Sequence, residues 1–313
     1  MAVALISNSD CGRHDTGWGH PEHVGRLRAI PAALRADPEL YQALLQVEGR
    51  HATPAELSLV HGADYVTSIT RAAERAEAEN AVIHLDPDTV VSGGSWDAAT
   101  AAAGCVLDAV DMAVDGRAIR SFCAVRPPGH HAVRDRAMGF CLFGSVALAA
   151  RWARVHHGMD RVLIVDWDVH HGNGTQALVE ADRGIHYVSM HQWPWYPGTG
   201  AAEDHGPHGT VWNVPHGAGL PRAQSTGALL GAVDRATAGF SPQLVLVSAG
   251  FDSLRGDPLG GFTLELEDID QLTRELKGRA DLWCGGRLVS ALEGGYAVGQ
   301  TAAACVAHLR AMV

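Results

Sequence analysis

The sequence predicts an α/β protein with a largely parallel, doubly wound sheet, and two observations lead to that prediction. The first is a set of short apolar runs, each bounded by Gly, Pro or Asp. Runs that are apolar on both faces are typical of parallel strands covered by helices. The second is the alternation of these runs with longer Ala- and Leu-rich stretches of helical periodicity. This alternation implies right-handed crossovers between strands of one sheet.

The expected elements follow one another in a simple order. Strands are expected at VALIS near the start, SFCAV at 121–125, RVLIVDW at 161–167, GIHYVSM at 184–190, LVLVSAG at 244–250 and RLVSALEGG at 287–295. Helices are expected over 71–80, 95–114, 144–156, 222–238 and 266–279. Because no internal repeat and no Gly/Ser- or Pro-rich linker interrupts this order, residues 1–313 are interpreted as a single domain.

Composition excludes several classes of protein. With 47% hydrophobic and 19% charged residues, the chain is not of the disordered type. Its 35 acidic and 24 basic residues give a formal charge of −11, which disfavours nucleic-acid binding but not lysine-rich peptides or polyamines. The six cysteines are scattered and are interpreted as reduced thiols. Without a signal-peptide pattern or a long apolar stretch, we expect a cytoplasmic protein that makes no membrane contact.

The motif DWDVHH marks a candidate metal site at the end of an expected strand. Alternate residues of an extended chain share a face, so Asp166, Asp168 and His170 would point together. Buried carboxylates need a partner or a metal, and carboxylates with an imidazole suit zinc or another first-row divalent ion. Asp252, at the end of another expected strand, is the natural third protein ligand. Three protein ligands with one open position are typical of catalytic zinc.

Two further motifs carry groups suited to proton transfer. His130 and His131 follow two prolines after an expected strand, and imidazoles titrate near neutral pH. A second pair, His156 and His157, ends an expected helix and is interpreted as a helix terminus favoured by the dipole. Tyr296 follows two glycines that let the main chain approach a ligand, and its hydroxyl could donate to an oxyanion.

Taken together, the motifs resemble the zinc-dependent histone deacetylase family, which includes acetylpolyamine amidohydrolases and bacterial deacetylase-like proteins. The resemblance runs in order through HDTGWGHPEHVGRL at 14–27, AVRPPGHHA at 124–132, MGFCLFGSVALAA at 138–150, VLIVDWDVHHGNGTQ at 162–176, VSMHQWPWYPGTG at 188–200, NVPHGAG at 213–219, SAGFDSLRGDPLGGFTL at 248–264 and LEGGY at 292–296. Details of RPPGHHA, HHGNGT and LEGGY are similar to the class II branch. The fold implied is the single-domain arginase/deacetylase fold, with a largely parallel sheet of about eight strands between helices.

The resemblance also implies roles for individual residues. It implies one zinc ion per chain, held by Asp168, His170 and Asp252. The implied catalytic residues are the general base His131, its electrostatic partner His130, the carboxylate Asp166 that orients His130, Asn173 beside His131, and the carbonyl-polarising Tyr296. A structural potassium ion is implied, largely on main-chain carbonyls, at Asp166, Asp168, His170, Ser189 and Met190. The acyl-lysine tunnel would have the walls Phe140 and Tyr196 and the floor Gly139, with Arg26 behind the metal.

The substrate is where the sequence leaves alternatives. Polyamine-specific relatives often carry a glutamate just after the GDP of the third-ligand loop, whereas this chain has Leu259, which cannot pair with an ammonium group. In contrast, the block at 92–104 resembles polyamine amidohydrolases, and Asp86 or Asp88 could bind a substrate N–H group or a cation. We therefore favour an acylated lysine peptide or protein, or a similar small acylated amine, over an acetylpolyamine.

The predicted function is thus a zinc-dependent amidohydrolase that removes acyl groups, chiefly acetyl, from lysine side chains or similar amines. Acetylpolyamine amidohydrolase is the alternative, followed by an arginase-like two-metal hydrolase and by a non-catalytic binding protein. The sequence leaves open the acyl length, the choice between zinc and iron, and whether the chain forms homo-oligomers.

Overall fold

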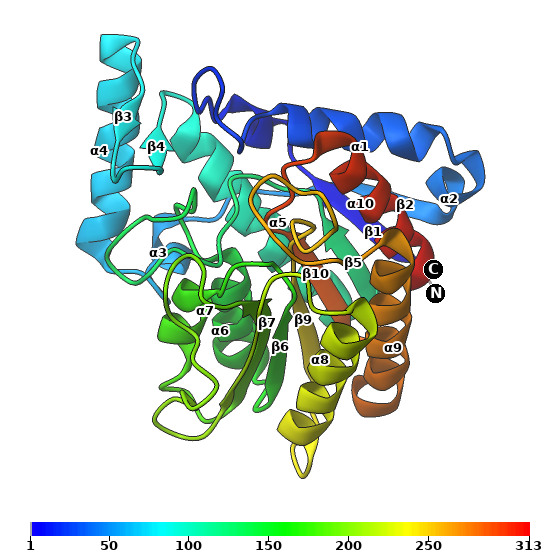
Figure 1. Cartoon of the computed structure of the whole chain (residues 1–313). Helices are drawn as coiled ribbons and strands as arrows, with labels where there is room; N and C mark the ends of the chain where they lie inside the picture. Colours follow the sequence, from blue (N-terminus) through cyan, green and yellow to red (C-terminus); the bar gives the residue numbers. More distant parts are fainter. Residues whose placement is uncertain (1) are drawn as a thin grey trace.

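The computed structural model describes residues 2–313 and places them around an eight-stranded parallel sheet (Figure 1). In the order in which they pair, the strands are β2 (Leu44–Glu48), β1 (Val3–Ser7), β5 (Arg120–Cys123), β10 (Leu288–Leu292), β9 (Leu244–Ala249), β6 (Val162–Asp166), β7 (Ile185–Gln192) and β8 (Val211–His216). The short strands β3 (Ile83–His84) and β4 (Val90–Val91) form a separate antiparallel pair. All six expected strands are present, and β2 and β8 complete the sheet at its two edges.

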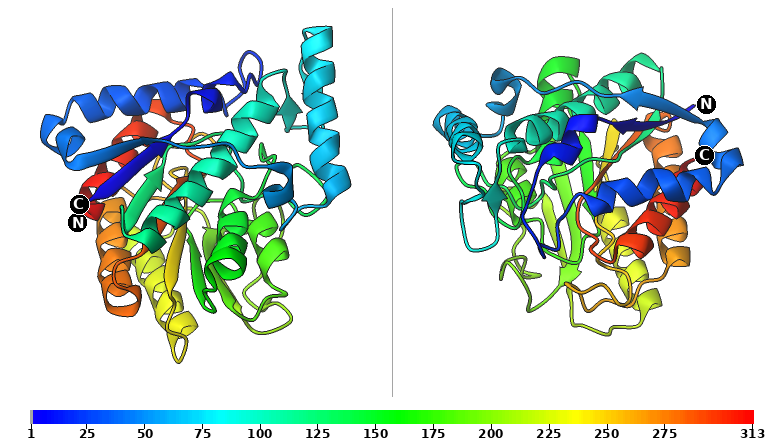
Figure 2. Two further views of the ribbon diagram at one scale, coloured as in Figure 1. Left: turned by 180° about the vertical axis from the view of Figure 1, so that it is seen from behind. Right: turned by 90° about the horizontal axis from the view of Figure 1, so that it is seen from above.

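Helices cover both faces of the sheet, as Figures 1 and 2 show. One face carries α1 (Gly25–Arg35), α8 (Arg222–Thr237), α9 (Leu266–Cys284) and α10 (Val298–Met312). The other carries α5 (Ser95–Asp115), α6 (Ser145–His157) and α7 (Asn173–Val179). The remaining helices are the short η1 (Ser9–Arg13), α2 (Pro38–Ala43) and α3 (Pro54–Leu57), and the longer α4 (Ala63–Glu79) beyond α5.

The side chains of β6 explain why both faces need helices. Leu163 and Val165 pack into the apolar core on one face, whereas Val162 and Ile164 pack into the core on the other. Since side chains alternate along a strand, a run that is apolar at every position has to be covered twice. The expected helices over 95–114, 144–156, 222–238 and 266–279 are confirmed as α5, α6, α8 and α9.

The parallel arrangement brings the polar motifs to one edge. Four adjacent central strands, β5, β10, β9 and β6, all end at the same side of the sheet. Asp166 at the end of β6 lies in register with Ser248 of β9, and Ala249 lies in register with Leu292 of β10. Ligand sites of open α/β sheets lie outside such carboxyl ends, so the segments that follow these strands are where a site is expected.

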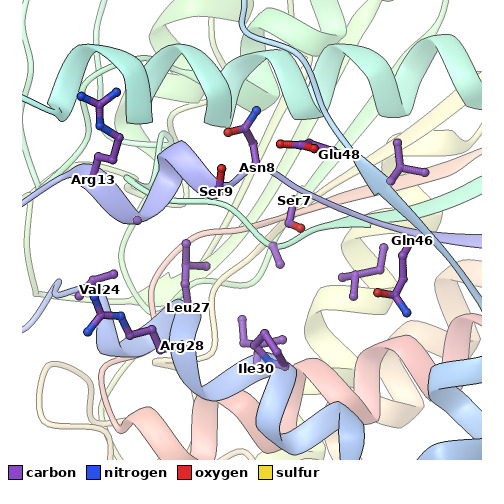
Figure 3. Close-up of a pocket in the computed structure, with 15 residues that line it drawn as sticks. Ser7, Asn8, Ser9, Arg13, Val24, Leu27, Arg28, Ile30, Gln46 and Glu48 are labelled. Atoms are coloured by element: carbon purple, nitrogen blue, oxygen red, sulfur yellow. The ribbon is translucent and has the colours of Figure 1, made fainter.

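A cavity of about 770 Å³ lies between β1, β2 and α1, and Ala124, directly after β5, is one of its lining residues (Figure 3). Leu27 and Ile30 contribute apolar surface to it, while Arg13, Arg28 and Glu48 supply charge. None of the candidate site residues from the sequence lines this cavity. Within residues 2–313, no helix combines the length and the apolar character needed to span a bilayer.

Candidate active site

Asp168, His170 and Asp252 converge at the carboxyl edge of the sheet. The first two follow β6 and the third follows the neighbouring β9. Each side chain offers one ligand atom, and these atoms lie within 4.8 Å of one another. His170 Nδ1 is 3.0 Å from Asp168 Oδ1 and 3.2 Å from Asp252 Oδ2. All three side chains are buried, so the cluster predicted from the sequence is a compact interior site.

Two glycines make room for the carboxylates of this cluster. A Cβ atom on Gly250 would clash with Asp168 Oδ2, and one on Gly294 would clash with Asp252 Oδ2. Burial by itself would lower the pKa of His170, but hydrogen bonds with Asp168 and Asp252 raise that pKa to about 10. The pocket therefore favours positive charge, and two carboxylates with an imidazole are a donor set that fits a divalent cation such as zinc.

The strand-end histidine pair, His130 and His131, follows β5 and faces the end of β6. His130 Nδ1 lies 3.1 Å from Asp166 Oδ2, and His131 Nδ1 lies 2.8 Å from Asn173 Oδ1. Because a carboxylate and an amide oxygen are acceptors, each imidazole donates through Nδ1. The Tyr187 hydroxyl also donates to Asp166 Oδ2, at 3.0 Å. These bonds fix the orientation of both rings, and in each ring Nε2 lies on the side away from the Nδ1 partner.

The two imidazoles have opposite preferences for a proton. Burial alone would lower the pKa of His130, but the carboxylates of Asp168 and Asp166 raise it well above the ordinary imidazole value. For His131, burial lowers the pKa well below that value, and the neighbouring His130 and His170 lower it further. These opposite directions favour a proton on His130 over one on His131, whose Nε2 is then left with a lone pair.

Tyr296 lies on the turn between β10 and α10, and this turn is bound from two sides. Arg26 donates through Nε to the Gly295 carbonyl at 2.6 Å and through Nη2 to the Glu293 carbonyl. On the other side, Asp257 Oδ2 accepts the Tyr296 N–H at 2.7 Å. Gly295 has a φ of 119°, which favours glycine at this position. The Arg26 guanidinium also lies 5.0 Å from the centre of the Tyr296 ring.

A buried ion cluster holds Arg26 against the turn. Glu22 Oε1 accepts from Arg26 Nη1 at 2.9 Å, and Arg126 donates to both Glu22 oxygens at 2.8 and 2.7 Å. All three side chains are fully buried. Burial would raise the pKa of Glu22, but Arg126 and Arg26 lower it below the usual carboxyl range. The cluster is therefore charged at neutral pH, and it places Arg26 behind the turn.

A narrow cavity of about 200 Å³ connects His131, His170 and Tyr296 with the surface. It is lined by Asp88, His131, Gly139, Phe140, His170, Trp195, Tyr196, Leu259 and Tyr296. The Tyr196 ring centre lies 5.0 Å from that of His131, and the Phe140 ring centre lies 5.8 Å from that of Tyr296. Since Trp195 is 47% exposed and His131 only 4%, the cavity leads from an exposed aromatic mouth to buried polar groups.

The inner wall depends on a tight approach at Gly139. A Cβ atom there would clash with the His131 ring, so glycine lets the loop close over the imidazole. Phe140 follows with a φ of 68°, and its N–H donates to Thr89 Oγ1 at 3.1 Å. Gly139, the predicted floor, thus packs against His131, and Phe140, a predicted wall, is bonded to Thr89.

The other residues predicted from the sequence lie around this cavity. Asp88 lines it, but Asp86 is not among its lining residues and accepts the Asp88 N–H at 3.0 Å, so Asp86 shapes the turn that presents Asp88. Ser189 and Met190 are buried on β7, and Ser189 pairs in register with Asp166. The residues that the resemblance assigns to potassium therefore come from the end of β6, the segment after it and the neighbouring part of β7.

Two residues to which the sequence assigned no role also belong to the site. Trp195 forms part of the cavity mouth, and its indole N–H donates to the Leu259 carbonyl at 2.9 Å. Glu293 is buried, and its Oε2 accepts the N–H groups of Gly129 at 2.6 Å and His130 at 3.1 Å. The signals available for them were the aromatic run WPWY and an acidic residue within an otherwise apolar strand end.

Comparisons with known proteins agree with this architecture. A family model described as the histone deacetylase domain matches residues 20–312. The chain is 38% identical over 317 residues to the uncharacterized protein slr0245 of Synechocystis sp., covering 99% of both chains. It is 37% identical over 309 residues to the human polyamine deacetylase HDAC10, covering 95% of this chain and 46% of that one, about half its length.

Solved structures give the same assignment. The crystal structure of the HDA15 HD domain matches with a TM-score of 0.92 and 35% sequence identity, covering 99% of this chain and 88% of that chain. The expected arrangement of a parallel sheet between two layers of helices is thereby confirmed. With a family model that spans nearly all its residues and a solved relative of the same fold, the chain belongs to the histone deacetylase family.

Proposed function

We propose that this chain is a zinc-dependent amidohydrolase that removes acyl groups, chiefly acetyl, from lysine side chains or similar amines. The observation that carries the proposal is the narrow cavity that joins the exposed Trp195 to Tyr296 and to the buried His131 and His170. A slot with aromatic walls accepts a thin acyl-amine chain and brings its amide next to acid–base groups. Membership of the histone deacetylase family supports a hydrolase of this class.

Asp168, His170 and Asp252 are the residues proposed to hold one zinc ion per chain, and the space cleared for their carboxylates supports the fit. Bound there, zinc would supply Lewis-acid chemistry that polarises the amide carbonyl and lowers the pKa of a water molecule. A structural potassium ion is proposed, from the resemblance alone, at Asp166, Asp168, His170, Ser189 and Met190.

His131 is the proposed general base. Its Nδ1–H is held by Asn173, and its low pKa keeps Nε2 free to accept the proton of the attacking water. His130, oriented by Asp166, keeps a positive charge beside it. The departing nitrogen then takes that proton from the histidine pair and leaves as a neutral amine, while the acyl part becomes a carboxylic acid. The acid gives up its proton to the amine, so the products are a carboxylate and an ammonium group.

Tyr296 is the proposed donor to the acyl carbonyl. Negative charge builds on that oxygen when water adds to the amide, and a fixed hydroxyl stabilises it most at that point. The turn that carries Tyr296 is bound to Arg26 on one side and Asp257 on the other, which supports a fixed donor.

The proposed substrate follows from the cavity lining. Phe140 and Tyr196 would contact the methylene chain, with Gly139 beneath it, and Asp88 could accept an N–H group of the substrate. Leu259 offers no charge for a distal ammonium group. We therefore propose acyl-lysine, or a small acylated amine, as the substrate class.

The experiment that tests this function is a substrate panel. Acetyl-lysine and longer acyl-lysine peptides are compared with N-acetylated polyamines, with a hydroxamate inhibitor as the control and the zinc content measured in the same preparation. The proposal expects hydroxamate-sensitive release of acetate from the peptides and one zinc per chain. Absence of turnover on every acylated amine would contradict it.

Two other functions have specific observations in their favour. Acetylpolyamine hydrolysis is supported by Asp88 at the cavity and by the name of the human relative. An arginase-like hydrolase would share the Asp168 and His170 half of the site, but it needs two metal ions. Two manganese ions per chain instead of one zinc would identify that chemistry, and metal binding without any turnover would favour a non-catalytic binding protein.

A further inference from the structure

The turn of residues 293–297 has two charged partners, one positive and one negative. Its carbonyl groups, those of Glu293 and Gly295, accept from Arg26. Its N–H groups at Tyr296 and Ala297 instead donate to an acidic residue whose other contacts the mechanism above does not consider. This second partner is Asp257.

Asp257 is 5% exposed, and its carboxylate accepts hydrogen bonds from main-chain N–H groups. Its Oδ2 accepts the N–H groups of Tyr296 at 2.7 Å and Ala297 at 3.1 Å. Its Oδ1 accepts the N–H of Leu259 at 2.9 Å. Within residues 2–313, no Lys, Arg or His side chain forms an ion pair with it at 4.0 Å or less. A buried carboxylate needs compensation, and here three N–H groups provide it.

These bonds connect two parts of the candidate site. Leu259 lines the cavity mouth, and its carbonyl accepts the indole N–H of Trp195 at 2.9 Å. Tyr296 lines the same cavity next to the buried polar groups. A single carboxylate therefore fixes the main chain of a mouth residue through one oxygen and that of Tyr296 through the other.

We propose that Asp257 is the positioning residue that holds the Tyr296 hydroxyl at a fixed position relative to the cavity mouth. The proposal rests on the function proposed above and adds a residue through which the mouth and the reacting end of the tunnel are coupled. An asparagine cannot replace it, because an amide has one acceptor oxygen and its NH₂ would face one of the two sets of N–H donors.

Hydrogen exchange tests the positioning without any substrate. The variant Asp257→Asn is compared with Asp268→Asn, a matched control that is 7% exposed and accepts the Glu265 N–H at 2.8 Å in the first turn of α9. We expect exchange in the peptide covering 294–298 to accelerate about tenfold in Asp257→Asn, the size of one lost hydrogen bond to a charged group. Wild-type exchange rates there would overturn the proposal.

Kinetics then separate positioning from general loss of structure. Asp257→Asn should lower kcat about tenfold with a smaller change in KM, while Asp268→Asn should keep wild-type kcat. In a Tyr296→Phe background, where the hydroxyl is already absent, Asp257→Asn should cost less than about twofold in kcat. An equal loss in both backgrounds would mean that Asp257 acts through the fold and not through Tyr296.

Failure of this proposal and failure of the proposed function give different results. If wild type hydrolyses no acylated amine, the function is wrong, and the exchange measurement still decides whether Asp257 fixes the turn. If Asp257→Asn does not fold, Asp257→Ser, which keeps one acceptor oxygen, is measured with the same expectations for peptide 294–298.

Discussion

Two of the three pairs of adjacent histidines in this chain have the same composition and different surroundings. The strand-end pair, His130 and His131, follows β5 at the carboxyl edge of the sheet, and its side chains are only 3% and 4% exposed. The helix-end pair, His156 and His157, ends α6, where His156 is exposed and stacks on Trp152 at 4.0 Å. Their contrast shows how environment, more than residue type, determines what an imidazole can do.

An aspartate partner does not distinguish the two pairs. His130 Nδ1 lies 3.1 Å from Asp166 Oδ2, and His157 Nε2 lies 2.6 Å from Asp111 Oδ1. Only the first pair, however, has a second carboxylate, Asp168, within 3.8 Å and no solvent to screen it. At the helix end, water screens the charges and the imidazoles interact with the helix dipole. Catalytic potential thus comes from burial beside additional charge.

The largest effect is expected from removing a metal ligand at the strand ends. Asp252→Ala should lose stoichiometric zinc together with activity, by roughly 10³-fold or more in kcat/KM, because Lewis-acid stabilisation is worth several kcal/mol. Asp111→Ala removes the aspartate of the helix-end pair and should change neither quantity. Metal analysis and hydrolysis assays measure both; an Asp252→Ala protein with full zinc and near-normal turnover would show that the ligand assignment is wrong.

The histidines themselves provide the second test. His131→Ala should lower kcat by about 10²–10⁴, the range of general acid–base catalysis, since no other neutral imidazole is oriented at that position. His157→Ala should leave kcat unchanged. Steady-state kinetics on an acetyl-lysine peptide decide the matter, and comparable losses in both variants would abolish the distinction between the two pairs.

How much of the fold could be predicted depended on burial. The central strands are apolar on both faces, and their runs were visible in the sequence. β2 and β8 were not, because they lie at the sheet edges and keep exposed or polar positions such as Gln46 and Asn213, with Pro215 in β8. α1 contains Pro31, which is unusual inside a helix and weakened its signal. Edge elements carry less of the periodic pattern on which such predictions depend.

The residues of the candidate site also differ in how well the sequence predicts them. Asp168, His170 and Asp252 could be predicted because they are polar side chains directly after apolar strands. Asp257 could not, because its partners are main-chain N–H groups, one of them at Tyr296, 39 residues away. Any residue supplies such an N–H group, so the sequence contains no pattern for it. Arg26 could be placed behind the metal only through the resemblance, because the turn carbonyls that it binds are likewise main-chain groups without a sequence pattern.

A smaller effect is expected at Tyr296. Tyr296→Phe should lower kcat by roughly 10²–10³, the scale of one oxyanion donor, with less change in KM. Tyr65→Phe is the matched control, because the Tyr65 hydroxyl donates at 2.6 Å to the Leu142 carbonyl in the apolar core. That variant should lose stability and keep its kcat. A loss confined to KM in Tyr296→Phe would mean that the tyrosine only binds substrate.

The smallest effect concerns substrate choice at the cavity mouth. Leu259 lines the mouth with Asp88 and the half-exposed Trp195, and it offers no charge to a distal ammonium group. Leu259→Glu adds a carboxylate there, and because an exposed ion pair contributes about 0.2–1 kcal/mol, we expect only a few-fold gain in kcat/KM on an N-acetylated polyamine. Wild type and variant are measured on that amine and on an acetyl-lysine peptide. Should wild type already prefer the polyamine by more than about tenfold, or 1.4 kcal/mol, an existing acid must recognise the charge. Asp88, which faces the cavity, is then the first residue to replace, with Asp86 behind it, and the order of the two substrate classes is reversed.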